Sequence, residues 1–417
     1  MIDIKAFINN IEKTKNDFIR RGLSTELLEN IISLDKKRKD IQSLIDDYRE
    51  KRNQLSKEIG KNLSDSDNIK NQVKDIKNKL VNLENEQEDI IKNLKKISFR
   101  IPNMADENVP DGNSEDDNIT LFESEIPHHL QQKKIAHWDL KFSKNGIDFS
   151  RGVKLSGSRF YVLFGQLAQL QRALIQYLLH TLNQAGFNEV QVPYIVHQSA
   201  VEAAGQLPKF AENLYRDHLE DFWLIPTAEV PLTGLHKDEI LSADSLPILY
   251  CAHSPCFRRE KASAGKDGRG MKRGHQFDKV EMYAVCKPDQ GETVFEKMLA
   301  VTQKVCDDLE LPYRHKQLCT GDLGFAASKT IDVEVWASGC QEWLEVSSIS
   351  LCRDFQARRA KIRFKNNSKK ELCYTLNGSC MGIPRTLIAI IENNIQDNII
   401  HVPKVLQYWM KEKTITL

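Results

Sequence analysis

The chain has 417 residues, of which 41% are hydrophobic and 28% charged, with a formal net charge of +1. This length allows two or three domains, and the near-zero charge excludes a general basic field, so a nucleic-acid surface would need local charge separation. We find no signal-peptide pattern and no stretch near the roughly 18 apolar residues of a membrane span, so we expect no membrane association. Nine scattered cysteines without a C-x-x-C pair predict a reducing, cytoplasmic location and no structural zinc.

Residues 1–100 have the composition of exposed helices, rich in Lys, Glu, Asp and Asn and without Trp or Cys. Apolar residues at 4–18 predict one short amphipathic helix. Two seams of heptad-spaced apolar residues follow, at 27–59 and 69–97, with a polar break between them. Two such seams joined by one turn predict an antiparallel coiled-coil hairpin over residues 24–98, with helices ~50 Å long.

The charge of this predicted hairpin is uneven. Residues 49–79, around the expected turn, include nine basic and five acidic residues, whereas residues 84–89 are acidic. A charge run of this kind is usually a solvated coiled-coil face. The functional alternative is a basic tip that contacts phosphates, and the sequence by itself leaves both interpretations open.

The rest of the chain has a different composition. Residues 101–120 are rich in Pro, Gly, Asp and Asn, which predicts a linker. From 121 to 417, Trp, Cys, Gly and β-branched residues appear, and strand-like and helical patterns do not alternate regularly. We therefore expect an α+β domain, an antiparallel sheet with helices packed on it. The clearest strand-like runs are 222–225, 275–285 and 342–351, and the clearest helical patterns are 164–185 and 384–394.

The strongest candidate for chemistry is a predicted hairpin over residues 256–283. No Gly-rich phosphate loop of the usual kinds occurs in the chain, so side chains would have to hold a nucleotide. Strand parity places Arg258 and Glu260 on one face of the first strand. On the second strand it places four residues on one face, namely His275, Phe277, Lys279 and Glu281, and turns Val280 and Met282 to the other. A guanidinium, carboxylates and an aromatic ring suit a nucleotide, although cross-strand ion pairs on a surface hairpin give the same pattern.

Two further segments carry candidate residues. Glu345 stands among apolar strand residues beside Ser347 and Ser348, and such oxygens can hold a hard cation such as Mg²⁺. A satisfied strand glutamate explains this pattern equally well. Arg385 follows Pro384 at the start of a predicted helix, where the helix end also attracts anions. The simpler alternative is a surface arginine on a buried helix.

These segments resemble motifs 2 and 3 of class II aminoacyl-tRNA synthetases. The helix 166–185 with the strand 189–193 resembles motif 1, which forms the dimer interface in that class. Seryl-tRNA synthetases have strings similar to TAE at 227–229, HQFDKVEM at 275–282, EVSS at 345–348, DFQARR at 354–359 and TLNGS at 375–379. The similarity, which includes the long N-terminal arm, covers essentially the whole chain. It implies a class II fold and a homodimeric serine–tRNA ligase that uses ATP and Mg²⁺.

The resemblance implies roles in ATP binding. Arg258 would bridge the α-phosphate and the serine carboxylate, Glu260 would hold the adenine amino group and Phe277 would stack on the ring. Arg273 and Arg385 would hold the γ-phosphate side. The full expected ATP set is Arg258, Arg259, Glu260, Arg273, Phe277, Glu345, Val346, Ser347, Ser348 and Arg385. The expected catalytic residues are Arg258, Glu345 and Arg385.

The resemblance also implies a magnesium site and a serine pocket. Glu345 and Ser348 would bind Mg²⁺, and since ideal strand parity points them to opposite faces, we expect a bulge or a strand end there. The expected serine-binding set is Thr227, Ala228, Glu229, Arg258, Glu281, Asn377 and Ser379. Glu281 would accept the serine hydroxyl. The serine carboxylate would attack the α-phosphate, and the seryl group would then pass to the 3′-terminal ribose of tRNA without a protein nucleophile.

For the hairpin, the resemblance implies a partner, tRNA(Ser), held through its long variable arm. It leaves open whether tRNA(Sec) is a second substrate. A related ligase that loads a carrier protein would lack the arm, and a catalytically inactive relative would lack the motif Arg or Glu residues. The threonine enzyme of this class needs zinc ligands, for which we find no convincing Cys/His set.

One position departs from the family pattern. Cys380 stands where the family usually has a glycine, next to Ser379 of the expected serine pocket. If this position required φ > 0, a cysteine there would cost roughly 1 kcal/mol or more. We therefore expect the pocket to differ most from the family near Ser379.

Overall fold

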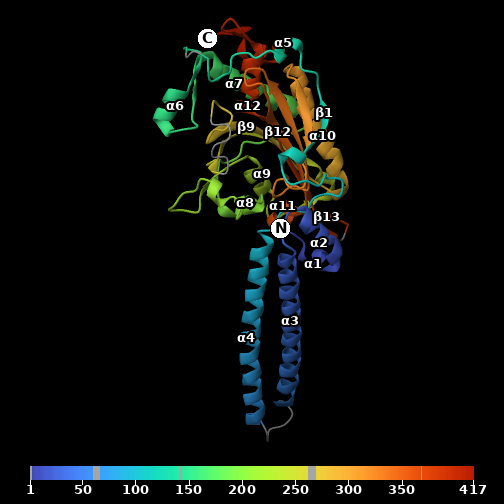
Figure 1. The fold of residues 1–417 in the computed structure, drawn as a ribbon. Coiled ribbons are helices and arrows are strands. Elements are labelled where there is room, and N and C mark those ends of the chain that lie inside the picture. Colours follow the sequence, from blue (N-terminus) through green and yellow to red (C-terminus); the bar gives the residue numbers. More distant parts are fainter. Residues whose placement is uncertain (1, 60–65, 141–142, 262–268, 368) are drawn as a thin grey trace. The chain divides into compact units, whose positions relative to one another are not determined.

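The computed structural model describes residues 2–59, 66–140, 143–261, 269–367 and 369–417. The chain forms two compact units, an N-terminal helical unit of residues 2–101 and a larger unit of residues 102–417 (Figure 1). Within the described residues, none of the helices combines the length and the apolar character needed to cross a bilayer.

The N-terminal unit is entirely helical. Its helices are α1 (Ile4–Asn9), α2 (Ile11–Arg20), α3 (Thr25–Ile59) and α4 (Ser66–Ser98). The prediction of one short helix before the hairpin was wrong, because the helix is interrupted at Asn10, whose φ of −140° and ψ of 75° are not helical. The Asn10 side chain caps α2 by accepting the backbone N–H of Lys13 at 3.2 Å.

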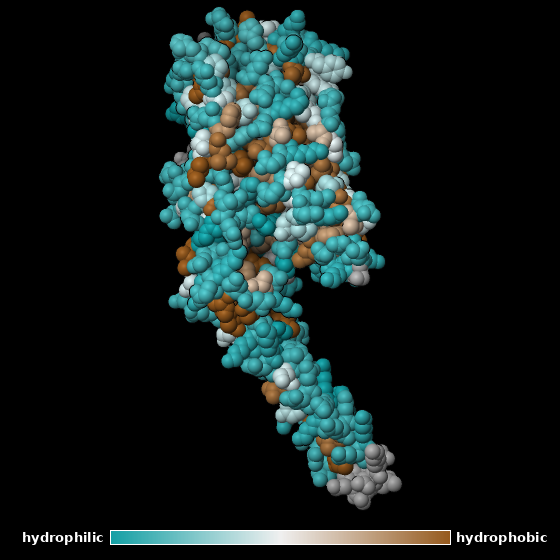
Figure 2. All heavy atoms as spheres, turned by 90° about the vertical axis from the view of Figure 1, so that its right-hand side faces the viewer, coloured by the Kyte–Doolittle hydropathy of each residue, from teal (hydrophilic) through white to brown (hydrophobic). Residues whose placement is uncertain are grey.

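Helices α3 and α4 form the predicted coiled-coil hairpin. They have 35 and 33 residues, so each is ~50 Å long. Residues of the predicted seam are buried, among them Ile41, Ile45, Ile76, Leu80 and Ile90. The polar seam residue Gln87 donates to Gln42 of the other helix at 2.8 Å. Much of the expected turn, residues 60–65, lies outside the described residues. The visible face of the hairpin in Figure 2 is mostly hydrophilic, as the solvated flanks of a coiled coil should be.

An eight-stranded sheet forms the centre of the larger unit, in the order β1-β10-β11-β12-β15-β9-β8-β4. Its strands are β1 (Ile119–Glu123), β4 (Asn188–Glu189), β8 (Ile248–Phe257), β9 (Gln276–Cys286), β10 (Tyr313–Gln317), β11 (Lys329–Ala337), β12 (Glu342–Arg353) and β15 (Tyr374–Gly382). Neighbouring strands are antiparallel except for β4 and β8, which are parallel. The expected antiparallel α+β fold is therefore confirmed, with one parallel pair at an edge.

The edge strand β4 is shorter than the sequence predicted. The strand expected at 189–193 is only Asn188–Glu189. One further bond, from the N–H of Val190 to the carbonyl of Cys251 at 2.8 Å, continues the contact with β8. Pro193 then follows, and since proline has no N–H it cannot extend a ladder.

The two faces of the sheet have different roles. Helices α7 (Gly165–Gln184), α10 (Gly291–Asp308) and α12 (Ile383–Asn394) share the main hydrophobic core with one face. Helices α8 (Gln198–Ala203), α9 (Glu229–Leu235) and α11 (Phe355–Ala360) pack near part of the other face. Val280 and Met282 of β9 belong to the main core. As strand parity predicted, the residues that alternate with them face the opposite side, which leaves that side available for a polar site.

The predicted linker, residues 101–120, belongs to the larger unit from Pro102 onward. Ala105 and Val109 are buried against Leu318 and Leu323. The side-chain amide of Asn103 donates to the carbonyl of Cys352 at 2.9 Å. The linker prediction was wrong for this segment, because its few apolar side chains and its amides find partners far away in the sequence.

Smaller elements complete the larger unit. They are α5 (His128–Gln131), α6 (Phe149–Ser156), α13 (Gln407–Met410), β2 (Ile147–Asp148), β3 (Val162–Leu163), β5 (Ile195–Val196), β6 (Trp223–Leu224), β7 (Ile240–Ser242), β13 (Arg363–Asn366), β14 (Lys369–Leu372), β16 (Ile395–Gln396), β17 (Ile399–His401) and β18 (Thr414–Thr416).

Candidate active site

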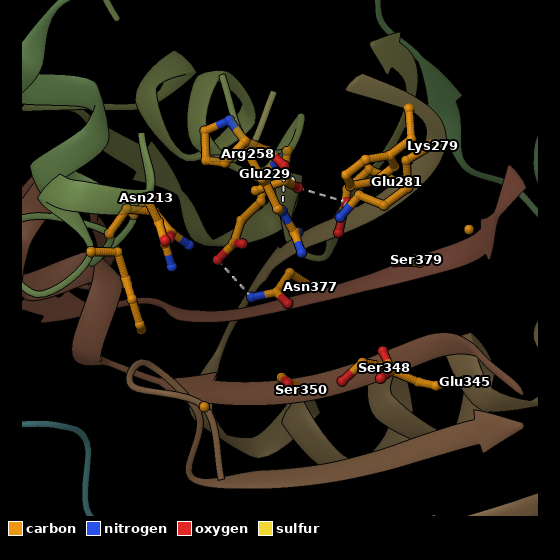
Figure 3. Close-up of a pocket in the computed structure, with 18 of the residues that line it drawn as sticks. Asn213, Glu229, Arg258, Lys279, Glu281, Glu345, Ser348, Ser350, Asn377 and Ser379 are labelled. Carbon is orange, nitrogen blue, oxygen red and sulfur yellow. Dashed lines mark hydrogen bonds and ion pairs between the residues drawn. The ribbon is translucent and has the colours of Figure 1, made fainter. Parts of the chain in front are cut away.

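A polar cavity of about 690 Å³ lies on the sheet face opposite the main core. Strands β9, β12 and β15, the segment that follows β8, and the first turns of α9 and α12 contribute to its walls. Figure 3 shows Glu345, Ser348 and Ser350 along one strand and Asn377 and Ser379 along the next, with Glu229, Arg258, Lys279 and Glu281 gathered above them. All but three of the predicted site residues line this cavity.

The three exceptions are Ala228, Arg259 and Ser347. Ala228 is buried in a hydrophobic cluster. The guanidinium of Arg259 lies 4.6 Å from the ring centroid of Tyr215 and donates to the carbonyl of Leu214 at 3.0 Å. The hydroxyl of Ser347 donates to the carbonyl of Ser379. These three residues lie outside the cavity lining, and their assignment to the ATP and serine sets stays a prediction.

A β-bulge brings Glu345 and Ser348 to the same cavity. In the ladder between β11 and β12, Val333 is opposite Ser347 and Glu334 is opposite Glu345, so Val346 is an extra residue. One extra residue reverses the alternation of side chains along a strand. Both Glu345 and Ser348 therefore line the cavity, and the expected bulge is confirmed.

One end of the cavity contains a buried hydrogen-bonded group around Glu281. The hydroxyl of Thr227 donates to Oε2 of Glu281 at 2.8 Å, and Glu281 is only 1% exposed. The ammonium of Lys279 pairs with the same carboxylate. The sequence analysis did not include Lys279 in the site, although strand parity placed it on the same face as Phe277 and Glu281. A buried acceptor beside a cation can recognise a small ligand by accepting a hydrogen bond from its hydroxyl group.

Glu229 is the second carboxylate of this end. Its Oε1 accepts hydrogen bonds from the side-chain amides of Gln356 at 2.6 Å and Asn377 at 2.8 Å. Burial, followed by the charge of Glu281, raises the pKa of Glu229 to about 7. Because a bound cation would favour the ionised form, Glu229 is suited to pairing with the ammonium group of an amino acid.

The part of the cavity beside this hydrogen-bonded group combines an aromatic ring with guanidinium groups. The guanidinium of Arg258 lies 5.2 Å from the ring centroid of Phe277. Glu260 follows β8 with a left-handed φ of 47°, which is uncommon for a residue with a side chain. Its carboxylate lies 3.7 Å from the guanidinium of Arg273. An aromatic ring beside arginines and a carboxylate can accept a purine and its phosphates.

Arg385 connects the start of α12 to two other parts of the wall. Helix α12 begins at Ile383. Pro384 is therefore its second residue, whereas the sequence analysis predicted it as the first. The guanidinium of Arg385 lies 3.4 Å from the carboxylate of Glu345, and its Nε donates to the carbonyl of Lys272 at 3.3 Å. The expected phosphate-binding arginine therefore lies between β12 and the segment 269–274.

Asp332 of β11 is an acidic residue beside the predicted magnesium site that the sequence analysis missed. It is opposite Ser348 in the ladder. Burial, followed by the charge of Glu345, raises its pKa well above the usual value. In the part of the chain that the structure describes, no donor reaches its buried Oδ1. A buried oxygen without a donor, next to a second carboxylate and a hydroxyl, suits a hard cation, so these residues fit Mg²⁺.

Cys380 does not have the strained backbone that the family comparison suggested. It is absent from the residues with positive φ. It lies at a register shift between Ser379 and Met381, and it is fully buried in the main core. The cysteine therefore points away from the cavity, and Ser379 keeps its place in the cavity wall.

The sheet and the cavity have the architecture of a class II aminoacyl-tRNA synthetase. Residues 210–394 match the family model described as the tRNA synthetase class II core domain (G, H, P, S and T). Residues 1–105 match the seryl-tRNA synthetase N-terminal domain. The chain belongs to the seryl-tRNA synthetase family.

Individual relatives agree with this assignment. The chain is 45% identical to a serine–tRNA ligase of Roseiflexus sp. (strain RS-1) over 98% of both chains, and 43% identical to one from Chloroflexus aurantiacus, also over 98% of both. It resembles the crystal structure of a Pyrococcus horikoshii seryl-tRNA synthetase complexed with ATP, with a TM-score of 0.94 and 36% identity over 100% of this chain and 99% of the other. A cytoplasmic serine–tRNA ligase from Naegleria fowleri in complex with AMP gives a TM-score of 0.90 at 28% identity, with the same coverage.

Proposed function

We propose that the protein activates L-serine with ATP and transfers the seryl group to tRNA(Ser). The observation that carries this proposal is the position of Arg258 in one continuous cavity, beside the Phe277 ring. The same cavity holds the buried Thr227–Glu281 pair. A single cation can thereby serve an amino-acid carboxylate and a nucleotide α-phosphate together. Relatives named as serine–tRNA ligases and the structure of a seryl-tRNA synthetase complexed with ATP support the same activity.

The reaction proceeds in two balanced steps. A serine carboxylate oxygen attacks the α-phosphorus of ATP, the bond to pyrophosphate breaks, and seryl-adenylate forms. A ribose hydroxyl at the 3′ end of tRNA then attacks the seryl carbonyl carbon, and AMP leaves. Arg258 and Arg385 stabilise the developing charge, and Glu281 and Glu229 orient the amino acid. Mg²⁺, held by Glu345 and Ser348 with Asp332 nearby, would supply neutralisation of phosphate charge when bound.

The partners and the assembly belong to the same proposal. The arm of residues 1–100 binds the long variable arm of tRNA(Ser), and the unit that follows catalyses both steps. Two copies form a homodimer through the segment 166–193, and the enzyme acts in the cytoplasm. Light scattering at assay concentration tests the dimer, and a stable, fully active monomer would contradict it.

Charging assays test the proposed substrate. Purified protein should acylate tRNA(Ser) with radiolabelled serine, and tRNA(Ser) lacking its variable arm should be charged far less. The same assay with a tRNA(Sec) transcript tests whether this tRNA is a second substrate. Equal charging of tRNAs with and without the arm would contradict the role given to the hairpin.

A further inference from the structure

Glu392, on the buried side of α12, joins three parts of the chain: α12 itself, His137 and residues 339–340. Its Oε1 accepts the backbone N–H of His137 at 3.0 Å and lies 2.7 Å from Nδ1 of the same residue. Its Oε2 accepts the N–H groups of Gly339 at 3.0 Å and Cys340 at 2.8 Å. Burial by itself would raise the pKa of Glu392, but the hydrogen bonds from His137 and the other donors hold it below its usual value. The residue is therefore a buried, fully bonded carboxylate.

The other ring nitrogen of His137 holds a fourth segment. Its Nε2 accepts the backbone N–H of Met271 at 3.0 Å. Since an acceptor nitrogen carries no proton, the proton is on Nδ1, which donates to Glu392. The chain passes the ring so closely that a Cβ at Gly270 would lie 1.9 Å from Nε2. Gly270 also has a φ of +73°, so only glycine suits this approach.

The segment held in this way enters the cavity directly. Met271, Lys272 and Arg273 all line it. The carbonyl of Lys272 accepts a hydrogen bond from Arg385 at 3.3 Å. The described part of this segment is therefore fastened at Met271 through His137 and at Lys272 through Arg385, and both attachments lead to α12.

A metal ion is the main alternative for this cluster. One ligand atom from each of His137, Cys340 and Glu392 lies within 4.8 Å of the others, as in a metal site. However, both ring nitrogens of His137 are already in hydrogen bonds, and three backbone N–H groups occupy Glu392. A cation at Nδ1 would have to displace the proton that links the two side chains, so the contacts favour a structural link over a metal site.

We propose that His137 is a positioning residue: its acceptor Nε2 sets Met271, and with it Lys272 and Arg273, against the phosphate side of the cavity, while Glu392 fixes the tautomer of the ring. His137 touches no substrate, yet the affinity for ATP depends on it. This inference rests on the proposed function, because it assigns a determinant of ATP binding in the same site.

A matched pair of substitutions distinguishes the two hydrogen bonds that the His137 ring makes, one with Glu392 and one with Met271. His137→Asn keeps an N–H donor near the place of Nδ1 but offers no acceptor to Met271. His137→Gln places a carbonyl oxygen near Nε2, which keeps the Met271 acceptor and loses the donor to Glu392. Each variant removes one buried hydrogen bond, so both should lower Tm to a similar degree.

The expected results differ between the two variants. His137→Asn should raise the KM for ATP about tenfold, because the loss of one buried hydrogen bond costs about 1 kcal/mol. The KM for serine should stay within about twofold of the wild type. Calorimetry with ATP should show the same loss, and hydrogen exchange of the peptide 269–275 should become faster. His137→Gln should restore the slow exchange and most of the ATP affinity. Gly270→Ala disturbs the same contact from the loop and should reproduce the selective loss for ATP.

Three results would overturn the inference. The first is an unchanged KM for ATP in both His137→Asn and Gly270→Ala. The second is a parallel change of the ATP and serine KM values in both His137 variants, which a general loss of structure would give. The third is a rise in Tm on adding Zn²⁺ to the wild type but not to Cys340→Ser, which would show a metal site. ATP calorimetry and hydrogen exchange do not depend on which amino acid is activated, so they still decide the matter if serine activation itself fails.

Discussion

The hydroxyl of Thr227 donates a 2.8 Å hydrogen bond to Oε2 of Glu281, and both side chains are buried at one end of the cavity. The donor comes from the turn before α9 and the acceptor from β9, so the bond links two distant parts of the chain. A ligand hydroxyl that reaches Glu281 would join a network that is already oriented. A ligand without this hydroxyl would leave a buried acceptor with one partner fewer, which is the physical basis for selecting serine over alanine.

Removing this acceptor should damage serine recognition. Glu281→Ala should lower kcat/KM for serine by about 100-fold or more, because it removes a charged, buried hydrogen-bond acceptor. The wild type should reject alanine by about 10⁴, and the variant should lose this ratio mostly by losing serine. Glu281→Gln, which keeps an acceptor for Thr227, is the matched control and should retain more activity. Wild-type kcat/KM in Glu281→Ala would place hydroxyl recognition elsewhere.

Glu229 should make the stability of the ligand-free enzyme depend on pH. Its folded pKa of about 7 lies above the ordinary glutamate value of 4.5, so between these values the folded state binds more protons than the unfolded state. The free energy of unfolding therefore falls as pH rises through this window, by up to about 3 kcal/mol at pH 7 and above. Glu229→Gln keeps the acceptor for Gln356 and Asn377 and removes the charge. It should be more stable than the wild type at pH 8 and similar to it near pH 4.5.

Urea unfolding at the two pH values measures this difference, with serine absent. A larger stabilisation at pH 4.5 than at pH 8 would contradict the assignment. The same variant should raise the KM for serine, because an amide cannot neutralise the serine ammonium group.

Cys380 should contribute to stability and not to recognition. Cys380→Gly restores the residue usual in the family but removes a fully buried side chain from the main core. It should lower the free energy of unfolding by about 1–2 kcal/mol, from lost packing and from the flexibility of glycine in a strand. The KM for serine should stay within about twofold of the wild type. A large change in that KM with little loss of stability would show that the position shapes the pocket after all.

The helical arm should be needed for tRNA and dispensable for serine activation. Replacing residues 24–97 with a short linker should keep serine-dependent pyrophosphate exchange within about tenfold of the wild type, since the residues proposed for this step lie in the larger unit. Charging of tRNA(Ser) should fall by orders of magnitude, mostly through the KM for tRNA. Full charging by the armless protein would show that recognition lies in the larger unit.

Basic residues of the arm provide a finer test. Neutralising Lys51, Arg52, Lys74 and Lys77 together should weaken tRNA binding and reduce its dependence on salt, because phosphate contacts release counterions. Neutralising four lysines closer to the other end of the hairpin is the matched control and should have a smaller effect; these are Lys36, Lys92, Lys95 and Lys96. Equal effects of the two sets would remove the special role of the tip.

Much of this architecture could be predicted from periodicity. The apolar seams of α3 and α4 and the alternation of side chains along β9 are local patterns in the sequence. Many of the residues that these patterns assign to the core are buried. The bulge at Val346 was predictable only by requiring Glu345 and Ser348 to meet. The break at Asn10 was missed because the apolar spacing continues across it, whereas its side chain caps the next helix.

Other features depend on partners that a linear pattern does not contain. The segment 102–118 has the composition of a linker, yet its side chains find partners about 200 residues away. Asp332 and His137 could not be assigned from sequence, since their importance comes from a ladder register and from contacts with Met271 and Glu392. Ala228, Arg259 and Ser347 were assigned through the family resemblance; they adjoin residues that line the cavity but do not line it themselves.

Amino-acid-dependent ATP–pyrophosphate exchange tests the central claim most directly. With Mg²⁺ present, serine should support exchange, and alanine should support it about 10⁴-fold less in kcat/KM. Arg258→Ala should abolish exchange, because it removes the cation proposed to bridge the serine carboxylate and the α-phosphate. Exchange with alanine or threonine at the level seen with serine would contradict the account.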